Sequence, residues 1–209
     1  MPHVVDSDSI RESVFLIQNL VFASRPLCER IVQGAVPTRR VEITNENYFP
    51  WLHSTLSRLL LGVAIKTRVT MDILDAERRW LKKEDEADIE DVLELSKGVS
   101  RSYAIGRSTP DSGTINIREA CNKLIHANRV LLVNEPLIER DPDLDQRSDP
   151  HHECVPVFWG GVLRLEGEKA SSEWIVDLNV SEFCFALVDL VDRIDDLYDW
   201  PRVYKALGY

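Results

Sequence analysis

The sequence predicts a mainly α-helical, bundle-like fold with a small antiparallel β-hairpin before the C-terminal helix. Two patterns support this fold class. Residues 155–165 and 173–178 show the alternation of apolar and polar side chains that is typical of paired strands. Elsewhere, apolar residues recur at helical spacing in four stretches, near residues 10–21, 50–75, 117–127 and 181–198.

Length and composition indicate one domain. The chain has 209 residues, of which 44% are hydrophobic, and this is enough for a single sizeable core. We therefore expect one domain over residues 1–209. Its helical core would comprise residues 8–127 and 180–199, and residues 128–178 would form an insertion of loops and the hairpin.

The first helix is expected to begin at a capping box formed by Ser9 and Glu12. Its apolar stripe consists of Ile10, Val14, Ile17 and Val21. The Arg25-Pro26 pair predicts a break, because a proline disfavours helical geometry at the residue before it. A short second helix over residues 27–33 would follow this break.

The longest predicted helix begins near Pro50, a residue suited to a first helical turn, and extends to about Trp80. Gly62 and the Thr67–Thr70 cluster are positions where it could kink or split. The basic residues of its last turns are followed by an acidic run over residues 84–94, which we interpret as part of a solvated helix pair. A short helix near residues 92–95 and a loop over residues 96–113 then lead to the central helix.

The central helix, Asn116 to Ala127, carries the most suggestive chemistry of the chain. Asn116 and Glu119 form a capping box at its start. Its apolar arc consists of Ile117, Ala120, Cys121, Leu124 and Ile125. Along one edge of this arc, at spacings of four residues, lie Arg118, Asn122 and His126. A cation, an amide and an imidazole in this arrangement form either a site or a polar boundary between the core and water.

The segment from Asn122 to His126 resembles half of the signature of the HEPN superfamily. These are mainly α-helical domains; many are dimeric ribonucleases, and others bind nucleotides or are non-catalytic. Their signature is an Arg separated from a His by four to six residues, often Arg-Asn-x-x-x-His. Here Asn122-x-x-x-His126 matches, whereas Cys121 occupies the Arg position and Arg118 lies outside the family spacing. The stretch is also similar to uncharacterised bacterial proteins, a resemblance that implies no activity.

The resemblance implies metal-independent RNA cleavage with Arg118, Asn122 and His126 as catalytic residues. A histidine of near-neutral pKa moves the proton of the attacking 2′-hydroxyl, and a cation stabilises the charge on the phosphoryl oxygens. Two alternatives remain open. One is a non-catalytic, dimeric interaction module, with His126 near the helix end and Asn128 as its left-handed cap. The other is a binder of a small anion at the same three side chains.

Beyond the central helix, residues 130–133 predict a strand, and acidic turns follow. Residues 141–149 resemble a calcium loop, but Gln146 stands where glycine is required. The His-His-Glu-Cys run at 151–154 has no second ligand pair at zinc-like spacing. We therefore expect no metal and no cofactor. Gly160-Gly161 indicates a β-bulge or a close approach of the backbone.

The β-hairpin is expected to have residues 166–172 as its loop, with Trp174 and Val176 facing the helices. The last helix is capped by Asn179 or Ser181 and ends before Trp200-Pro201. Its buried stripe includes Phe183, Leu187, Leu190, Val191, Ile194 and Leu197.

Charge and cysteine usage restrict the partners and the location. A formal net charge of −10 argues against broad binding to duplex DNA, which requires a basic surface. RNA or a small anionic ligand, bound locally, and a second copy of the chain remain as candidate partners. The four cysteines are far apart, and no leader or membrane-spanning run is evident. These features predict a cytoplasmic protein that does not enter the membrane.

Overall fold

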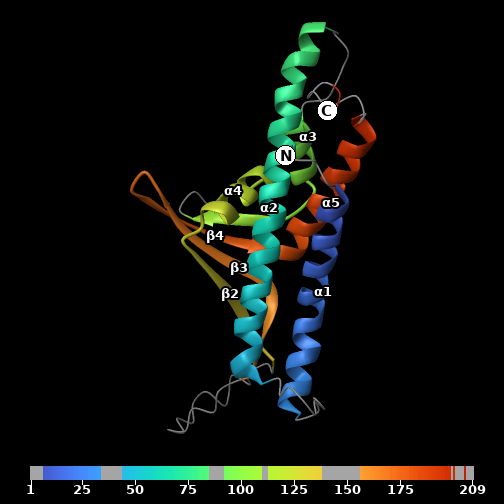
Figure 1. Cartoon of the computed structure of the whole chain (residues 1–209). Helices are drawn as coiled ribbons and strands as arrows, with labels where there is room; N and C mark the ends of the chain where they lie inside the picture. Colours follow the sequence, from blue (N-terminus) through green and yellow to red (C-terminus); the bar gives the residue numbers. More distant parts are fainter. Residues whose placement is uncertain are drawn as a thin grey trace.

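The computed structural model describes residues 7–33, 44–84, 92–109, 113–137, 156–198, 200 and 205. Five helices and a four-stranded antiparallel sheet lie in this part of the chain, so the expectation of a mainly α protein with a small β portion is confirmed. Figure 1 shows α1 and α2 side by side as long rods, with α2 extending well beyond the sheet. None of the described helices is both long and apolar enough to cross a membrane. The elements are α1 (Ser7–Val32), α2 (Asn45–Glu84), α3 (Val92–Ser100), β1 (Gly106–Thr109), α4 (Ile117–His126), β2 (Arg129–Pro136), β3 (Val157–Lys169), β4 (Ser172–Asn179) and α5 (Val180–Leu197).

Helix α1 continues through Pro26, so the predicted break at Arg25-Pro26 and the separate second helix are wrong. Proline removes one helical hydrogen bond, here the bond to the carbonyl of Phe22. Pro26 is exposed, and this position leaves that carbonyl open to water. The capping box at Ser9 is also wrong, because the helix already begins at Ser7 and the Ser9 carbonyl accepts a bond from the Ser13 hydroxyl at 2.8 Å.

Helix α2 is uninterrupted from Asn45 to Glu84, and at about 60 Å it is the longest helix described. It starts before Pro50, the predicted first-turn residue. It also passes Gly62 and the threonine cluster without splitting. The Thr70 hydroxyl donates to the carbonyl of Lys66 at 2.9 Å, the back-bonding geometry by which threonine is accommodated inside a helix.

The strand order of the sheet is β1-β4-β3-β2, and all pairs are antiparallel. The predicted hairpin is therefore only the central part of a larger sheet. Its loop is also shorter than expected, because Lys169 pairs with Ser172. Ala170 and Ser171 form a two-residue turn with φ values of 50° and 67°, as in type I′ turns. Strand β1 lies in the segment that we predicted as a loop over residues 96–113.

A two-residue bulge in β3 bends the sheet, as the Gly160-Gly161 pair predicted. Val133 pairs with Val162, but the next residue, Asn134, pairs with Trp159, so the two glycines have no partners on β2. Gly161 has a φ of 89°, in the left-handed region that favours glycine. A Cβ on Gly160 would lie 1.9 Å from Oε1 of Glu135, so the Glu135 carboxylate packs over this glycine and would have to move for a larger residue.

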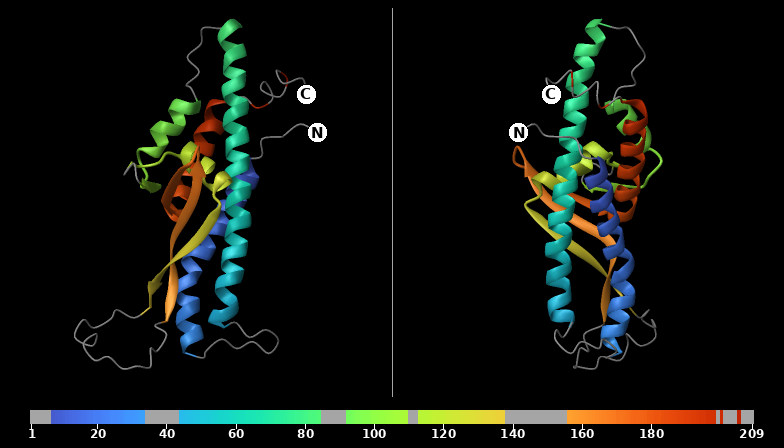
Figure 2. Two further views of the ribbon diagram at one scale, coloured as in Figure 1. Left: turned by 90° about the vertical axis from the view of Figure 1, so that its left-hand side faces the viewer. Right: turned by 45° about the vertical axis from the view of Figure 1, so that its right-hand side comes forward.

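The helices pack on one face of the sheet (Figure 2). Trp174, Val176 and Leu178 are buried on this face. Trp174 is 7% exposed and Val176 is fully buried, as the alternation predicted. The opposite face carries a bidentate pair between Arg164 and Asp177, with distances of 2.8 and 2.9 Å. Burial thus separates the two faces of the sheet into an apolar face and a charged face.

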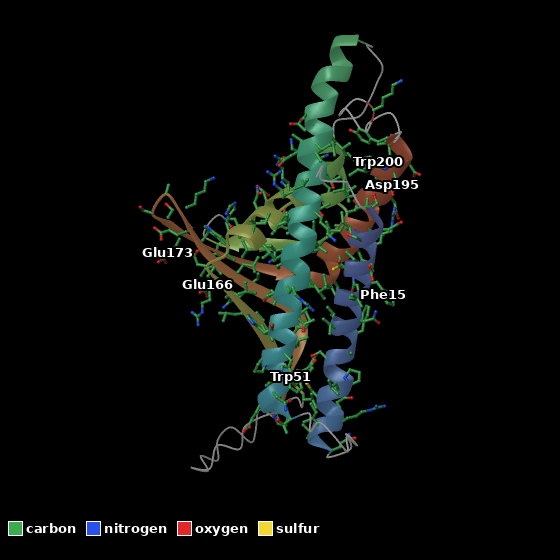
Figure 3. All side chains as sticks on the ribbon, in the orientation of Figure 1. Phe15, Trp51, Glu166, Glu173, Asp195 and Trp200 are labelled. Atoms are coloured by element: carbon green, nitrogen blue, oxygen red, sulfur yellow. The ribbon has the colours of Figure 1, made fainter. Side chains whose placement is uncertain are left out.

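Helices α1 and α5 run antiparallel, and contacts from end to end fix their register. The Gln18 side chain donates to the carbonyl of Ser181 at 3.2 Å. At the other end, Asp195 accepts hydrogen bonds from three side chains (Figure 3): those of Ser7 at 2.9 Å, Arg11 at 2.7 Å and Trp200 at 2.9 Å. Opposite charges and aligned donors therefore tie the start of α1 to the end of α5.

The predicted cap at the start of α5 is present, whereas the predicted cap at the end of α4 is not. Asn179 caps α5, since its side chain accepts from the backbone N–H of Glu182 at 3.1 Å. The predicted left-handed cap at Asn128 is wrong, because α4 ends at His126, its C-cap Ala127 is extended, and the chain passes directly into β2. The acidic stretch 85–91, the calcium-like segment 141–149 and the run 151–154 lie outside the described residues.

Candidate functional site

Helix α4 places the three predicted site residues in different surroundings. Its capping box is present, with the Asn116 side chain accepting from the backbone of Glu119 at 2.9 Å. A four-residue step turns the side chain about 40° beyond a full turn, so the stripe drifts around the helix. Arg118 borders α2, Asn122 is half-buried, and His126 is exposed. Among the described residues, the stripe forms a polar rim along the edge of the buried arc.

Arg118 is held by an ion-pair network with α2. Its Nη2 donates to Oδ1 of Asp72 at 3.0 Å, and the same oxygen accepts from Nη1 of Arg68 at 2.9 Å. Nη1 of Arg118 is buried and lacks a hydrogen-bond partner in the described part of the chain. One carboxylate thus holds two guanidinium groups, and this arrangement fixes Arg118 as a brace between α4 and α2.

His126 lies two turns away from Arg118. Eight residues of helix separate their Cα atoms by about 12 Å, and the two side chains point in different directions. His126 forms no hydrogen bond or ion pair with the described residues, and it lies in the last turn of α4. Asn122 and His126 therefore lie on adjacent turns of α4. Within one subunit, Arg118 lies too far from His126 for both side chains to contact the same phosphate.

Cys121, which stands where the HEPN signature has an arginine, belongs to the core. It is fully buried, and this burial raises the pKa of its thiol to about 12, although the nearby Arg68 and Arg118 act in the opposite direction. A neutral thiol in an apolar setting is neither a nucleophile nor a cation. Lys123, the next residue, places its ammonium 3.8 Å from the centroid of the Trp174 ring and so links α4 to β4.

A small groove of about 180 Å³ lies beside the last turn of α4. Its lining is almost entirely apolar, and Ser57 is the only residue in it with a polar side chain. No cation reaches into the groove, so it does not suit a small anion. The lining residues are Ser57, Leu60, Leu61, Leu124, Ile125, Ala127 and Val130.

The feature that the sequence interpretation missed is an exposed aromatic face on α1 and α5. Phe15 is 66% exposed, Phe22 is 65% exposed, and Phe185 on α5 is 47% exposed. The register fixed by Gln18–Ser181 at one end and Ser7–Asp195 at the other brings Phe185 level with Phe15. Figure 3 shows Phe15 on the side of α1 that points away from the sheet. The signal was present in the sequence: Phe15 and Phe22 are seven residues apart, opposite the buried stripe of α1.

Neither metal ligands nor relatives provide a further indication of chemistry. In the described ranges, no group of three or more His, Cys, Asp or Glu residues is placed to hold a metal ion. Comparisons with family models, with curated proteins and with solved structures found no match.

Proposed function

We propose that this protein is a non-catalytic interaction module that self-associates through the aromatic face of Phe15, Phe22 and Phe185. The observation that carries the proposal is the exposure of these three side chains on two adjacent helices. Aromatic side chains exposed on adjacent helices of a folded protein are typical of protein–protein interfaces, where buried aromatic anchors supply much of the affinity. Arg118, by contrast, is engaged by Asp72 and supports a bracing role for the rim of α4.

A second copy of the chain is the partner that this face fits. Along the exposed stripe of α1, Asp8 and Glu12 lie before the aromatic residues and Arg30 lies after them. A surface with opposite charges at its two ends complements a reversed copy of itself. The expectation of a homodimer is thereby kept, but the contact is assigned to α1 and α5 instead of α4.

Sedimentation equilibrium of the wild type and of a Phe15→Ser/Phe22→Ser variant tests the proposal. We expect the wild type to dimerise with increasing concentration and the variant to remain monomeric with an unchanged circular dichroism spectrum. The matched control is Leu61→Ser, since Leu61 is an exposed apolar residue, 42% exposed, in the groove beside α4. Monomeric wild-type protein at high concentration, or equal loss of dimer in the control, would refute the proposal.

RNA cleavage on α4 is the second candidate function, and one observation favours it. His126 is exposed and Asn122 is half-buried on the preceding turn, so solvent and a bound phosphate have access to both. If this activity is present, His126→Ala abolishes cleavage of single-stranded RNA at an unchanged melting temperature. Wild-type protein that leaves several RNAs intact would exclude it and leave the interaction module standing.

A further inference from the structure

We infer that two copies pair through α1 in antiparallel orientation, about a two-fold axis close to Asn19. The inference rests on the proposed self-association and specifies its geometry. It predicts which residues of the two copies face each other, and the evidence for it is the distribution of charged and aromatic side chains along one exposed stripe of α1.

The exposed stripe has the spacing of a helix–helix seam. Its members follow one another at steps of three or four residues, which keeps them on one face of a helix over several turns. Asn19 is at the middle, and its side chain bonds back to the carbonyl of Phe15 at 2.8 Å, within its own helix. From the first to the last turn, the exposed members are Asp8, Glu12, Phe15, Asn19, Phe22, Pro26 and Arg30.

The charges at the two ends select the orientation. Asp8 and Arg30 are each eleven residues from Asn19, or about 16 Å along the helix axis. An antiparallel pair therefore places Asp8 against Arg30 of the second copy at both ends. A parallel pair would place like charges together, Asp8 against Asp8 and Arg30 against Arg30, which is destabilising. The Asp8 side chain is 97% exposed despite a 3.3 Å contact with Arg11, so it is accessible to a partner.

The aromatic residues fit the same axis. Phe15 and Phe22 both lie on the shoulder of the stripe that faces α5, four residues before and three residues after Asn19. A two-fold axis perpendicular to the helices keeps this shoulder on the same side in both copies. Phe15 of one copy is then level with Phe22 of the other, and Phe185 extends the aromatic contact on the α5 side. On the opposite shoulder, Leu16 is level with Ala23 of the second copy by the same rule.

Cysteine cross-linking under mild oxidation tests the orientation. Cys28, Cys121 and Cys184 are buried, so single cysteines are introduced in a Cys154→Ser background of the full chain. We expect Asn19→Cys to cross-link with itself at the two-fold axis. Asp8→Cys alone is expected not to cross-link, because its two copies would lie about 33 Å apart, whereas a mixture of Asp8→Cys and Arg30→Cys should form the mixed dimer. Self-cross-linking of Asp8→Cys as fast as that of the mixture would overturn the antiparallel arrangement.

Charge reversal provides a second test that needs no cross-linking. Asp8→Arg should raise the dimer dissociation constant roughly 3- to 30-fold at low salt, since two exposed ion pairs are replaced by like charges. The Asp8→Arg/Arg30→Asp double variant should restore wild-type dimerisation, because the complementarity is only exchanged. A dimer that depends on Phe15 and Phe22 but ignores both charge variants, and forms no cross-link at Asn19, would refute this geometry and leave the proposed function intact. A wild-type chain that never dimerises would refute both.

Discussion

Replacing Trp174 by alanine should remove the anchor between the sheet and α4. The indole is 7% exposed, and removal of a buried tryptophan costs about 3–5 kcal/mol of unfolding free energy. The contact of the indole with the Lys123 ammonium, at 3.8 Å, contributes about 0.5–1 kcal/mol more. For a chain of this length each kcal/mol shifts the melting temperature by about 2–4 °C, so we expect a decrease of roughly 7–24 °C.

Guanidinium unfolding followed by far-ultraviolet circular dichroism measures this loss, and two further variants separate its causes. Lys123→Met retains the aliphatic stem and removes the ammonium, so it should cost less than the loss of the indole. Gly167→Ala would place a Cβ 2.1 Å from Cζ2 of Trp174, so it should cost about 1–3 kcal/mol by displacing the ring. A Trp174→Ala variant within about 1 kcal/mol of wild type would show that the indole does not anchor the sheet.

Three other predictions follow from the described contacts. Asp72→Ala should lower the unfolding free energy by about 1 kcal/mol, because removing the carboxylate also leaves two guanidinium groups facing each other. Arg118→Ala should lower the unfolding free energy by no more than this, and urea titration compares the two variants. Burial raises the pKa of Asp195, but hydrogen bonds from Arg11, Trp200 and Ser7 outweigh it, so the net shift is downward. This stabilisation is present above the unfolded-state pKa and is lost as the pH falls through the folded-state pKa; Asp195→Asn should therefore flatten the acid side of the stability–pH curve. In a Cys154→Ser background, Ellman's reagent should label no thiol of the native protein and three after denaturation, because burial raises the pKa of Cys28, Cys121 and Cys184.

Elements whose signals are local were predictable from the sequence. Helix α4 has its cap, its apolar arc and its last residue within a dozen positions, and the structure reproduces its bounds. The bulge at Gly160-Gly161 was similarly visible, because two glycines inside an alternating strand have few other uses. The break predicted at Pro26 is absent because packing outweighs the local cost of the proline. Ile17 and Cys28, which lie on either side of Pro26, are buried in the same core.

Elements and sites whose partners are distant were not predictable. Strand β1 has only four residues and forms by pairing Gly106 with Leu178, more than seventy positions away. The stripe on α4 showed which residues share an edge but not what lies beside that edge. The carboxylate that holds Arg118 is Asp72, 46 residues earlier, and no pattern within α4 indicates it.

The pairing of α1 with α5 has a consequence for synthesis of the chain. The buried side of α1 is completed by residues such as Ser181 and Asp195, which leave the ribosome more than 160 residues later. At about 5–20 residues per second, α1 waits roughly 8–35 s for its partner helix. During this interval its apolar stripe of Ile10, Val14 and Ile17 has no α5 to cover it, so the nascent chain is exposed to aggregation and to capture by chaperones until α5 arrives.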